Sequence, residues 1–335
     1  MIYYRVIALL FLSLSVSCSS VSSYKIINKE GFEEGQEIKE QSKFLVSSIA
    51  NASRKLHDIA WPIMISNLDS CQNSKINAFG LMIAHLEDIP SSLASSFYAA
   101  SPINSLINSK ADLPMIVSVA KDSPADRAKI IEGDLIISIN NSIVSYKNYK
   151  RLLDDAAQKG SLKIRIKRLE EKITYELESE LICGYPVQAM ISPIPNAYAD
   201  GSKIYITIAT LDFVKDDQEI AFLIAHELAH NIHHYKGEAL YESQGNPLAI
   251  EEKPSLQKIT DLLIFQTEEK ETEADLYGVE FAIKAGIAQD KVANYFRRLT
   301  IYMPQLMKNS FFRMHPGNAK RVADIERKLK ELNSN

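Results

Sequence analysis

The sequence is poor in several residue types, and each scarcity excludes a class of protein. Only three of the 335 residues are cysteines, which excludes a disulfide-rich scaffold. Glycine and proline number 12 each, which excludes fibrous and low-complexity chains. Neither sign of charge dominates, because 38 Lys and Arg residues stand against 42 Asp and Glu residues. A nucleic-acid partner would require a clustered basic surface, so none is expected.

Long hydrophobic runs are also missing. Beyond the N-terminus, no stretch approaches the roughly 18 consecutive apolar residues of a transmembrane helix. The composition, 46% hydrophobic and 24% charged, is that of a folded protein. A chain of 335 residues is long enough for two domains with a sizeable core.

Residues 1–17 are predicted to be a secretory signal, because Arg5 precedes a short apolar run that ends in small residues. The letters LSVSC at residues 14–18 resemble the lipobox of bacterial lipoproteins. This resemblance implies lipid attachment to Cys18 and, with Ser19 following, anchoring in the outer membrane. Plain secretion, with cleavage in the serine-rich stretch nearby, is the alternative. The expected location is the periplasm, with a lipid anchor in the outer membrane.

The rest of the chain divides into four segments. We expect a polar tether at residues 18–32, an N-terminal helical segment at 33–110, a β-rich domain at 111–180 and a catalytic domain at 181–335. In the helical segment, these apolar residues recur on one helix face: Ile38, Leu45, Ile49, Leu56, Ile59 and Ile63. Pro62 is expected to kink or break this helix. The helix is expected to wrap around the catalytic domain; facing a partner is the alternative.

Residues 111–180 resemble a bacterial PDZ domain. The pattern is a strand at 115–119, then SPA, GD, a β-branched strand, a helix at 149–158 and a last strand at 162–166. PDZ domains bind an added peptide strand through main-chain hydrogen bonds. Here the segment before Met115 lacks the usual loop glycine and contains Pro114. Two roles therefore stay open for this domain, capture of a peptide C-terminus and packing or gating.

The strongest pattern in the last domain is HELAH at residues 226–230, inside an apolar, helix-like run. Histidines four residues apart lie on one helix face, so the imidazoles of His226 and His230 can reach one zinc ion. Glu227 can then act as general base on a water. The alternative is an exposed helix with incidental histidines. The apolar surroundings oppose it, because burying these groups without a metal would be costly.

A zinc site needs a third protein ligand, and a second helical pattern supplies one. Glu271 and Asp275 are four residues apart and share a face, so Glu271 can ligate while Asp275 holds a ligand imidazole through its second N–H. Glu273 points elsewhere and is expected in solvent. For this acidic run alone, a solvated helix face is an equal alternative.

These residues resemble the gluzincin metallopeptidases that include HtpX and the CAAX prenyl endopeptidases. The shared pattern is HExxH followed by ExxxD within EAD..G, here ending at Gly278. Asn196-Ala197-Tyr198 resembles that family's edge strand beside the zinc, and His315-Pro316 with Arg321 resembles its C-terminal element. The chain is most similar to a soluble, exported branch that carries an inserted PDZ domain.

The resemblance implies an α+β fold: a mainly helical zincin-type metalloprotease domain with a small edge sheet, plus the PDZ-like β-rich domain and the N-terminal helical segment. It implies one Zn²⁺ per chain and a substrate extended along residues 196–198. His315 would stabilise the oxyanion or act as a fourth zinc ligand; a capping role in a turn that ends at a proline is the alternative. Arg321 is expected to pair with a buried carboxylate.

Three further features are left with alternatives. Cys71 and Cys183 are expected to form a disulfide, with two buried thiols as the alternative. His233 and His234 are expected at the surface rather than in a second metal site. Residues 237–265 are expected to roof the cleft or touch the membrane, with a plain buried helix as the alternative.

The function expected from these residues is zinc-dependent endopeptidase activity in the bacterial cell envelope. The substrates would be unfolded or misassembled exported proteins, with the outer-membrane assembly machinery as a further partner. The alternative is a chaperone-like binding protein of envelope assembly whose protease site is latent or weak. Dependence of the phenotype on Glu227 discriminates the two.

Overall fold

The computed structural model describes residues 30–72, 74–101, 113–235, 248, 267–302 and 319–334. The chain divides into two compact units, Met1–Gln41 and Ser42–Asn335. The predicted signal, Cys18, His315 and almost all of the predicted roof at 237–265 lie outside the described residues. Among the helices that are described, none is long and apolar enough to cross a membrane.

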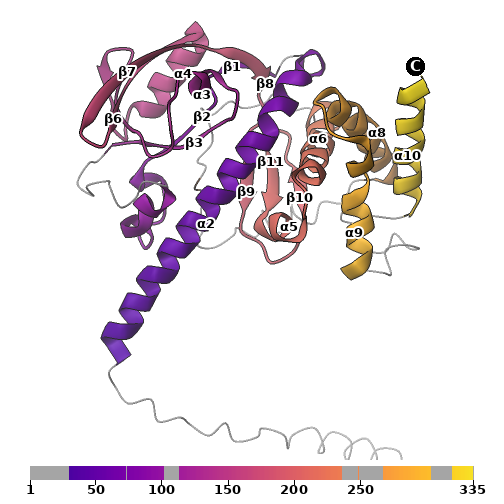
Figure 1. Ribbon diagram of the computed structural model, residues 1–335, viewed down its shortest axis with the longest axis horizontal. Helices are drawn as coiled ribbons and strands as arrows, with labels where there is room; N and C mark the ends of the chain where they lie inside the picture. The colour runs from indigo at the N-terminus through magenta and orange to yellow at the C-terminus, as the bar shows by residue number, and fades with distance from the viewer. Residues whose placement is uncertain are drawn as a thin grey trace, which may run out of the picture. The chain divides into compact units, whose positions relative to one another are not determined.

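The chain alternates strand-rich and helical stretches (Figure 1). In the N-terminal half the elements are α2 (Glu30–Ser66), η1 (Leu68–Cys71), β1 (Lys75–Ala78), β2 (Leu81–Ala84), η2 (Leu86–Asp88), η3 (Ala94–Ala100), β3 (Met115–Val119), α3 (Pro124–Arg127), β4 (Leu135–Ile139), β5 (Ser142–Ile143) and α4 (Tyr149–Lys159). They are followed by β6 (Ser161–Arg168), β7 (Glu171–Glu178), β8 (Glu180–Cys183), β9 (Val187–Met190), β10 (Ala197–Ala199), β11 (Ile204–Thr207), α5 (Ile208–Phe213), α6 (Asp217–His233), α8 (Glu268–Lys284), η5 (Gln289–Lys291), α9 (Asn294–Tyr302) and α10 (Ala319–Ser334). The expected α+β class is confirmed.

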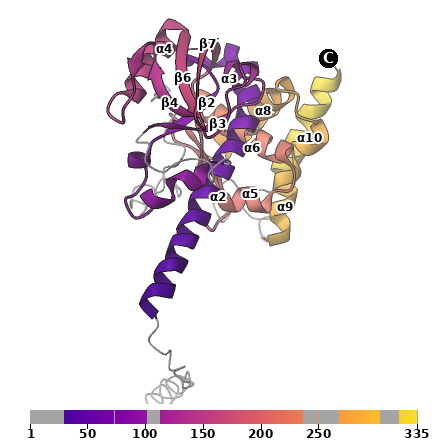
Figure 2. The ribbon, with the colours of Figure 1, turned by 60° about the vertical axis from the view of Figure 1, so that its left-hand side comes forward.

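The PDZ-like sheet has the strand order β2-β3-β4-β6-β7, with β5 paired to β4 and every pairing antiparallel. Helix α4 lies against β4 and β6 (Figures 1 and 2). It ends at Gly160, whose φ of 73° is the left-handed conformation that favours glycine at a helix C-terminus. The sheet begins at Leu81, before the expected boundary at residue 111, so the N-terminal segment is not helical throughout.

Helix α2 continues through Pro62, so of the two expected outcomes the break is wrong. A proline inside a helix removes one hydrogen bond and costs about 3 kcal/mol. Here the residues around it, Ala60, Trp61, Ile63 and Met64, are all buried in the core. Burial of large apolar side chains contributes roughly 1.5–3 kcal/mol each, which offsets the loss.

A disulfide joins Cys71 to Cys183, with the two Cα atoms 5.6 Å apart. It lies beside a two-stranded ribbon in which β1 pairs antiparallel with β8. The ribbon and the bridge therefore fasten the end of α2 to the strands that lead into the catalytic domain.

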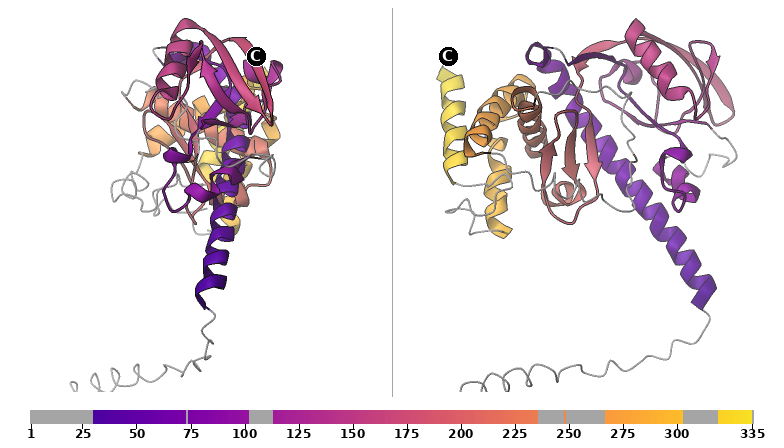
Figure 3. Two further views of the ribbon diagram at one scale, coloured as in Figure 1. Left: turned by 90° about the vertical axis from the view of Figure 1, so that its left-hand side faces the viewer. Right: turned by 180° about the vertical axis from the view of Figure 1, so that it is seen from behind.

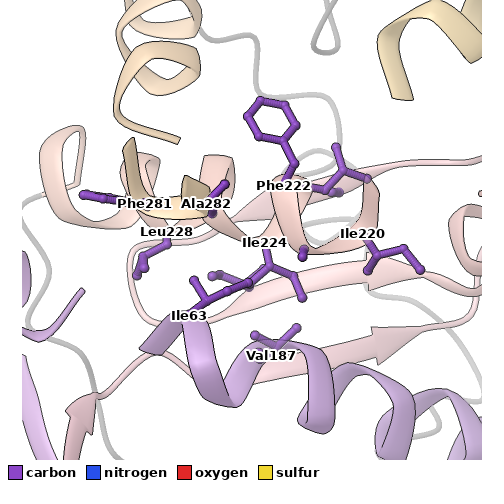
Figure 4. Packing of buried hydrophobic residues seen from close by; sticks show 14 of the residues in the cluster. Ile63, Val187, Ile220, Phe222, Ile224, Leu228, Phe281 and Ala282 are labelled. Carbon is purple, nitrogen blue, oxygen red and sulfur yellow. The ribbon is translucent and has the colours of Figure 1, made fainter. Parts of the chain in front are cut away.

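The catalytic domain combines a three-stranded sheet of order β10-β11-β9 with the helices α5 to α10. The sheet lies between the C-terminal part of α2 and helix α6 (Figures 1 and 3). One core joins all three, because Ile63 of α2 and Val187 of β9 pack below Ile224 of α6 (Figure 4). The expected wrapping of α2 around this domain agrees with this packing.

Candidate metal centre

Helix α6 is buried along most of its length. Asp216 caps its N-terminus by accepting a hydrogen bond from the Gln218 N–H at 3.0 Å. Residues 219–231 are buried without exception, including His226, Glu227 and His230. A helix that is apolar all round belongs in a core, so polar groups placed on it require partners there.

Helix α8 supplies those partners because a glycine lets it approach α6 closely. A Cβ on Gly278 would lie 3.0 Å from the Cα and 3.2 Å from the N of His226. Glu271 and Asp275 precede Gly278 by seven and three residues, so all three share one helix face. The close approach therefore directs both carboxylates at the histidines of α6.

The donor set fits one metal ion. The Nε2 atoms of His226 and His230 are 3.1 Å apart, and the Glu271 carboxylate oxygens lie 3.6 Å from the first and 3.4 Å from the second. Ligands about 2.0–2.1 Å from a tetrahedral zinc lie about 3.3–3.4 Å from one another. The separations here, with a different Glu271 oxygen facing each imidazole, are close to that spacing. The three residues can together hold a metal.

Each of the two oxygens of Asp275 accepts a hydrogen bond from Arg321 at 2.6 Å. Asp275 also lies 3.0 Å from Nδ1 of His226, so it orients that imidazole with Nε2 toward Glu271. The Arg321 guanidinium reaches Glu271 as well, at 3.1 Å, and stacks over the Phe296 ring. The placement agrees with the expected pairing of Arg321 with a buried carboxylate.

The charges of this cluster favour a divalent cation. Glu227, Glu271 and Asp275 are exposed by 1%, 3% and 0%, and Arg321, exposed by 3%, offers one positive charge against the three carboxylates. With both imidazoles neutral, as metal ligation requires, the remaining charge of about −2 is costly to bury and matches one M²⁺ ion. In the metal-free protein, burial lowers the pKa of His226, but hydrogen bonds to Asp275 and Glu271 outweigh it and raise the pKa to about 9. The site thus attracts positive charge.

The predicted substrate strand is held beside α6. Strand β10, which contains Ala197 and Tyr198, pairs with β11 on one side. The turn that follows is tied to α6 because the Gly201 N–H donates to Asn231, one residue after His230, at 2.7 Å. The N–H and C=O of Asn196 are both bonded to Thr207, the last residue of β11. Hydrogen bonds in an antiparallel ladder alternate, so Tyr198, opposite Tyr205, also directs its N–H and C=O to β11. Main-chain pairing with a substrate would therefore fall to Ala197 and Ala199, and the Ala199 carbonyl already accepts a hydrogen bond from Tyr235 at 2.8 Å.

One expectation about the side chains near the metal-binding histidines is wrong. The His234 side chain is only 4% exposed, not at the surface. It lies between the ring of His230 and Glu273, whose carboxylate is 3.1 Å from His234 Nε2. Glu273 is 48% exposed, as expected for a residue in solvent, and its carboxylate makes this contact from the surface. His233 is exposed and stacks on Tyr277, as expected for a surface residue.

Sequence reasoning missed two features, one beside the metal centre and one in the PDZ-like domain. Tyr295 of α9 is buried beside Glu227, and burial followed by that negative charge raises the pKa of its phenol. Gly80, with φ of 74°, directly precedes strand β2 of the PDZ-like sheet. The loop glycine typical of PDZ domains was instead expected before β3. The sequence signal for Gly80 was Phe79-Gly80-Leu81, in which a glycine stands between two large apolar residues.

Comparisons with known proteins agree with this geometry. The sequence model of Peptidase family M48 matches residues 156–329, just over half of the chain, and that of the PDZ domain matches residues 115–168. A comparison with curated proteins finds no match.

Among solved structures, the chain is similar to "HtrA-type protease AlgW with decapeptide", at 21% identity over 32% of this chain and 30% of that one, with a TM-score of 0.25. It is also similar to the HtrA3 PDZ domain bound to a phage-derived ligand, at 20% identity over 33% of this chain and 92% of that one, with a TM-score of 0.25. The chain therefore spans under a third of the length of AlgW. By its family match and its buried His-His-Glu group, the chain belongs to peptidase family M48, a family of zinc metallopeptidases.

Proposed function

We propose that this protein is a zinc endopeptidase of the bacterial cell envelope that cleaves misfolded or misassembled exported proteins. The observation that carries the proposal is the buried, net-negative cluster in which Glu227 lies on the same helix as His226 and His230, with Glu271 opposite them. Zinc is the ion proposed, because imidazole and carboxylate ligands at this spacing suit it. When bound, it supplies Lewis acidity for a peptide carbonyl and for water.

The chain's own groups perform the remaining steps. His226, His230 and Glu271 hold the ion, and Asp275 fixes the orientation of the first imidazole. Glu227 takes a proton from the attacking water and passes it to the leaving amine. The substrate backbone would lie along β10, a short strand whose neighbour is β11.

Export is supported by two features of the chain. The N-terminal residues have the pattern of a signal with a lipobox-like motif, and the Cys71–Cys183 bridge requires an oxidising compartment to persist. We propose a periplasmic enzyme that is lipid-anchored to the outer membrane through Cys18. Metabolic labelling with a fatty acid, compared between the parent and Cys18→Ser, tests the anchor; equal labelling would refute it.

For the PDZ domain we propose a packing and gating role. Arg54 of α2 donates to the Val117 carbonyl at 3.1 Å, and Asp58 accepts from the Lys121 N–H at 2.9 Å. Beyond β2, Asp88 accepts hydrogen bonds from Tyr149 and Lys150 at the start of α4. The first two contacts hold α2 against the sheet, and those of Asp88 join the segment after β2 to the start of α4, which supports packing rather than an open peptide groove. Binding of peptides that differ only by a free or an amidated C-terminus tests this; strong preference for the free acid would favour peptide capture.

The central experiment compares three proteins on an unfolded protein substrate, each with its zinc content measured. They are the parent, Glu227→Gln and the matched control Glu269→Gln, which removes an exposed carboxylate from α8. We expect the parent and the control to cleave, and Glu227→Gln to retain zinc with a loss of about 10²–10⁴-fold in rate.

Hydrolysis by Glu227→Gln at the parent's rate would refute the general-base role. No hydrolysis by the zinc-loaded parent, combined with suppression of substrate aggregation, would favour the chaperone-like alternative. The metal site is tested separately by the zinc content of His226→Ala and Glu271→Ala, which we expect to fall well below that of the parent.

A further inference from the structure

The two histidines of the metal centre differ in what supports them from behind. His226 is backed by a carboxylate, with Asp275 at 3.0 Å from its Nδ1. His230 is backed by another histidine, since its Nδ1 lies 2.8 Å from the Nδ1 of His234. On the far side of His234, Nε2 lies 3.1 Å from the carboxylate of Glu273. Three side chains from two helices therefore form a row that ends at a carboxylate.

The groups at the two ends of the row decide which ring nitrogen carries the proton in each histidine. His230 can offer a lone pair on Nε2 to a metal only when its ring proton is on Nδ1. That N–H must then donate to Nδ1 of His234, which requires the proton of the neutral His234 ring to be on Nε2. The Nε2–H in turn faces an ionised carboxylate, the best available acceptor. All contacts are satisfied with both rings neutral.

Burial of both histidine side chains strengthens the hydrogen bond between them. The side chain of His234 is 4% exposed and that of His230 is 1% exposed, so water competes poorly at the contact between them. Glu273 is about half exposed and can be replaced in part by solvent. His234 also ends α6, where its N–H donates to the His230 carbonyl, so its backbone position is fixed by the same helix turn.

We propose that His234 and Glu273 are positioning residues for the metal centre, in which the row His230–His234–Glu273 fixes the tautomer and the ring orientation of the second metal-binding histidine. Partners of this kind behind a metal ligand contribute about 10–100-fold to metal affinity. The proposal rests on the metal-binding part of the proposed function, and its test does not depend on hydrolysis.

The test measures zinc affinity of the purified full chain by competition with a chelator. His234→Leu removes the acceptor and is expected to weaken zinc binding by about 10–100-fold. His234→Asn returns an acceptor oxygen near the position of Nδ1 and is expected to recover most of the loss. Glu273→Gln is expected to weaken binding by less than about tenfold, because water can replace a half-exposed group. The matched control is His233→Leu, the same substitution one residue earlier at an exposed ring.

A second readout follows the protons directly. Long-range ¹H–¹⁵N spectra of the zinc-loaded parent should show His230 protonated on Nδ1 and His234 protonated on Nε2. This signature does not depend on how any variant folds. A His234 ring protonated on Nδ1 alone would overturn the proposal.

The outcomes separate the two proposals. If the parent binds zinc and His234→Leu binds it as tightly as His233→Leu, the positioning role is wrong while the metal site stands. If the parent binds no zinc, both are wrong. Loss of affinity in His234→Leu that His234→Asn does not restore would assign the effect to packing and also overturn the role.

Discussion

The close contact between α6 and α8 gives a sharp prediction for Gly278→Ala. The added Cβ would meet the Cα of His226 at 3.0 Å, its N at 3.2 Å and its Cβ at 3.4 Å. The first two are backbone atoms of a buried helix, so they cannot rotate out of the way. The two helices must instead separate by a few tenths of an ångström.

The expected magnitudes follow from that displacement. Overpacking a close contact costs about 1–3 kcal/mol, whereas alanine gains about 1 kcal/mol over glycine inside a helix. The net loss in the free energy of unfolding of the metal-free protein is therefore small, about 0–2 kcal/mol. Metal–ligand distances tolerate only about ±0.2 Å. Because Glu271 moves with α8, we expect zinc affinity to fall by about tenfold, more than the stability suggests.

The assay measures both quantities, zinc affinity by chelator competition and stability by urea unfolding without metal. Gly35→Ala is the control, because nothing lies within 4 Å of a Cβ built at that helical glycine. If Gly278→Ala bound zinc as tightly as the parent and Gly35→Ala, the close approach would not set the ligand geometry. The reasoning would then be refuted.

Three further predictions concern stability. Arg321→Met leaves Asp275 buried without its two hydrogen bonds, so we expect a loss of about 3–5 kcal/mol in urea unfolding; a loss below about 1 kcal/mol would contradict the assigned role. Burial lowers the pKa of His57 to about 4, so the unfolded chain binds the extra proton and stability falls as the pH drops from about 6.5 to 4. The full shift corresponds to about 3 kcal/mol, about 2 kcal/mol after allowing for the ring's partial exposure, and His57→Gln should remove this part of the pH dependence. Reduction of the Cys71–Cys183 bridge, which spans 112 residues, should lower the free energy of unfolding by about 3–5 kcal/mol, and an unchanged urea midpoint after reduction would contradict this.

Short-range patterns in the sequence were sufficient for the core of the site. Histidines four residues apart face one side of a helix, and the same spacing joins Glu271 to Asp275, so each half of the ligand set could be predicted by itself. Residue spacing does not predict which helices pack together. The family resemblance supplied that information, the docking of one ligand-bearing helix on the other. In the structure, that docking depends on Gly278, whose importance appears only when its neighbour is known.

The missed features depend on contacts between distant residues. Strand β2 has four residues and lies about thirty residues before its partner β3, so no local period identifies it as part of the sheet. His234 follows another histidine at the C-terminal end of α6, where the chain leaves the core and a surface position is the usual outcome. Only the position of Glu273 on α8 shows that the ring of His234 is enclosed. The break expected at Pro62 does not occur, because local propensity takes no account of the apolar surface that the helix buries on both sides of the proline.

The metal centre joins three helices that come from separate parts of the chain. Helix α6 supplies both histidines and Glu227, α8 supplies Glu271 and Asp275, and α10 supplies only Arg321. Arg321 reduces the negative charge of the three carboxylates by one unit, which leaves about −2 in a buried site when both imidazoles are neutral. A divalent ion removes this remainder and so favours the state in which all three helices are packed together. By linkage, each factor of 100 in the ratio of free metal to its dissociation constant adds about 2.7 kcal/mol to the stability of that state. Metal binding and the docking of α10 should therefore strengthen each other, although Arg321 is not itself a metal ligand.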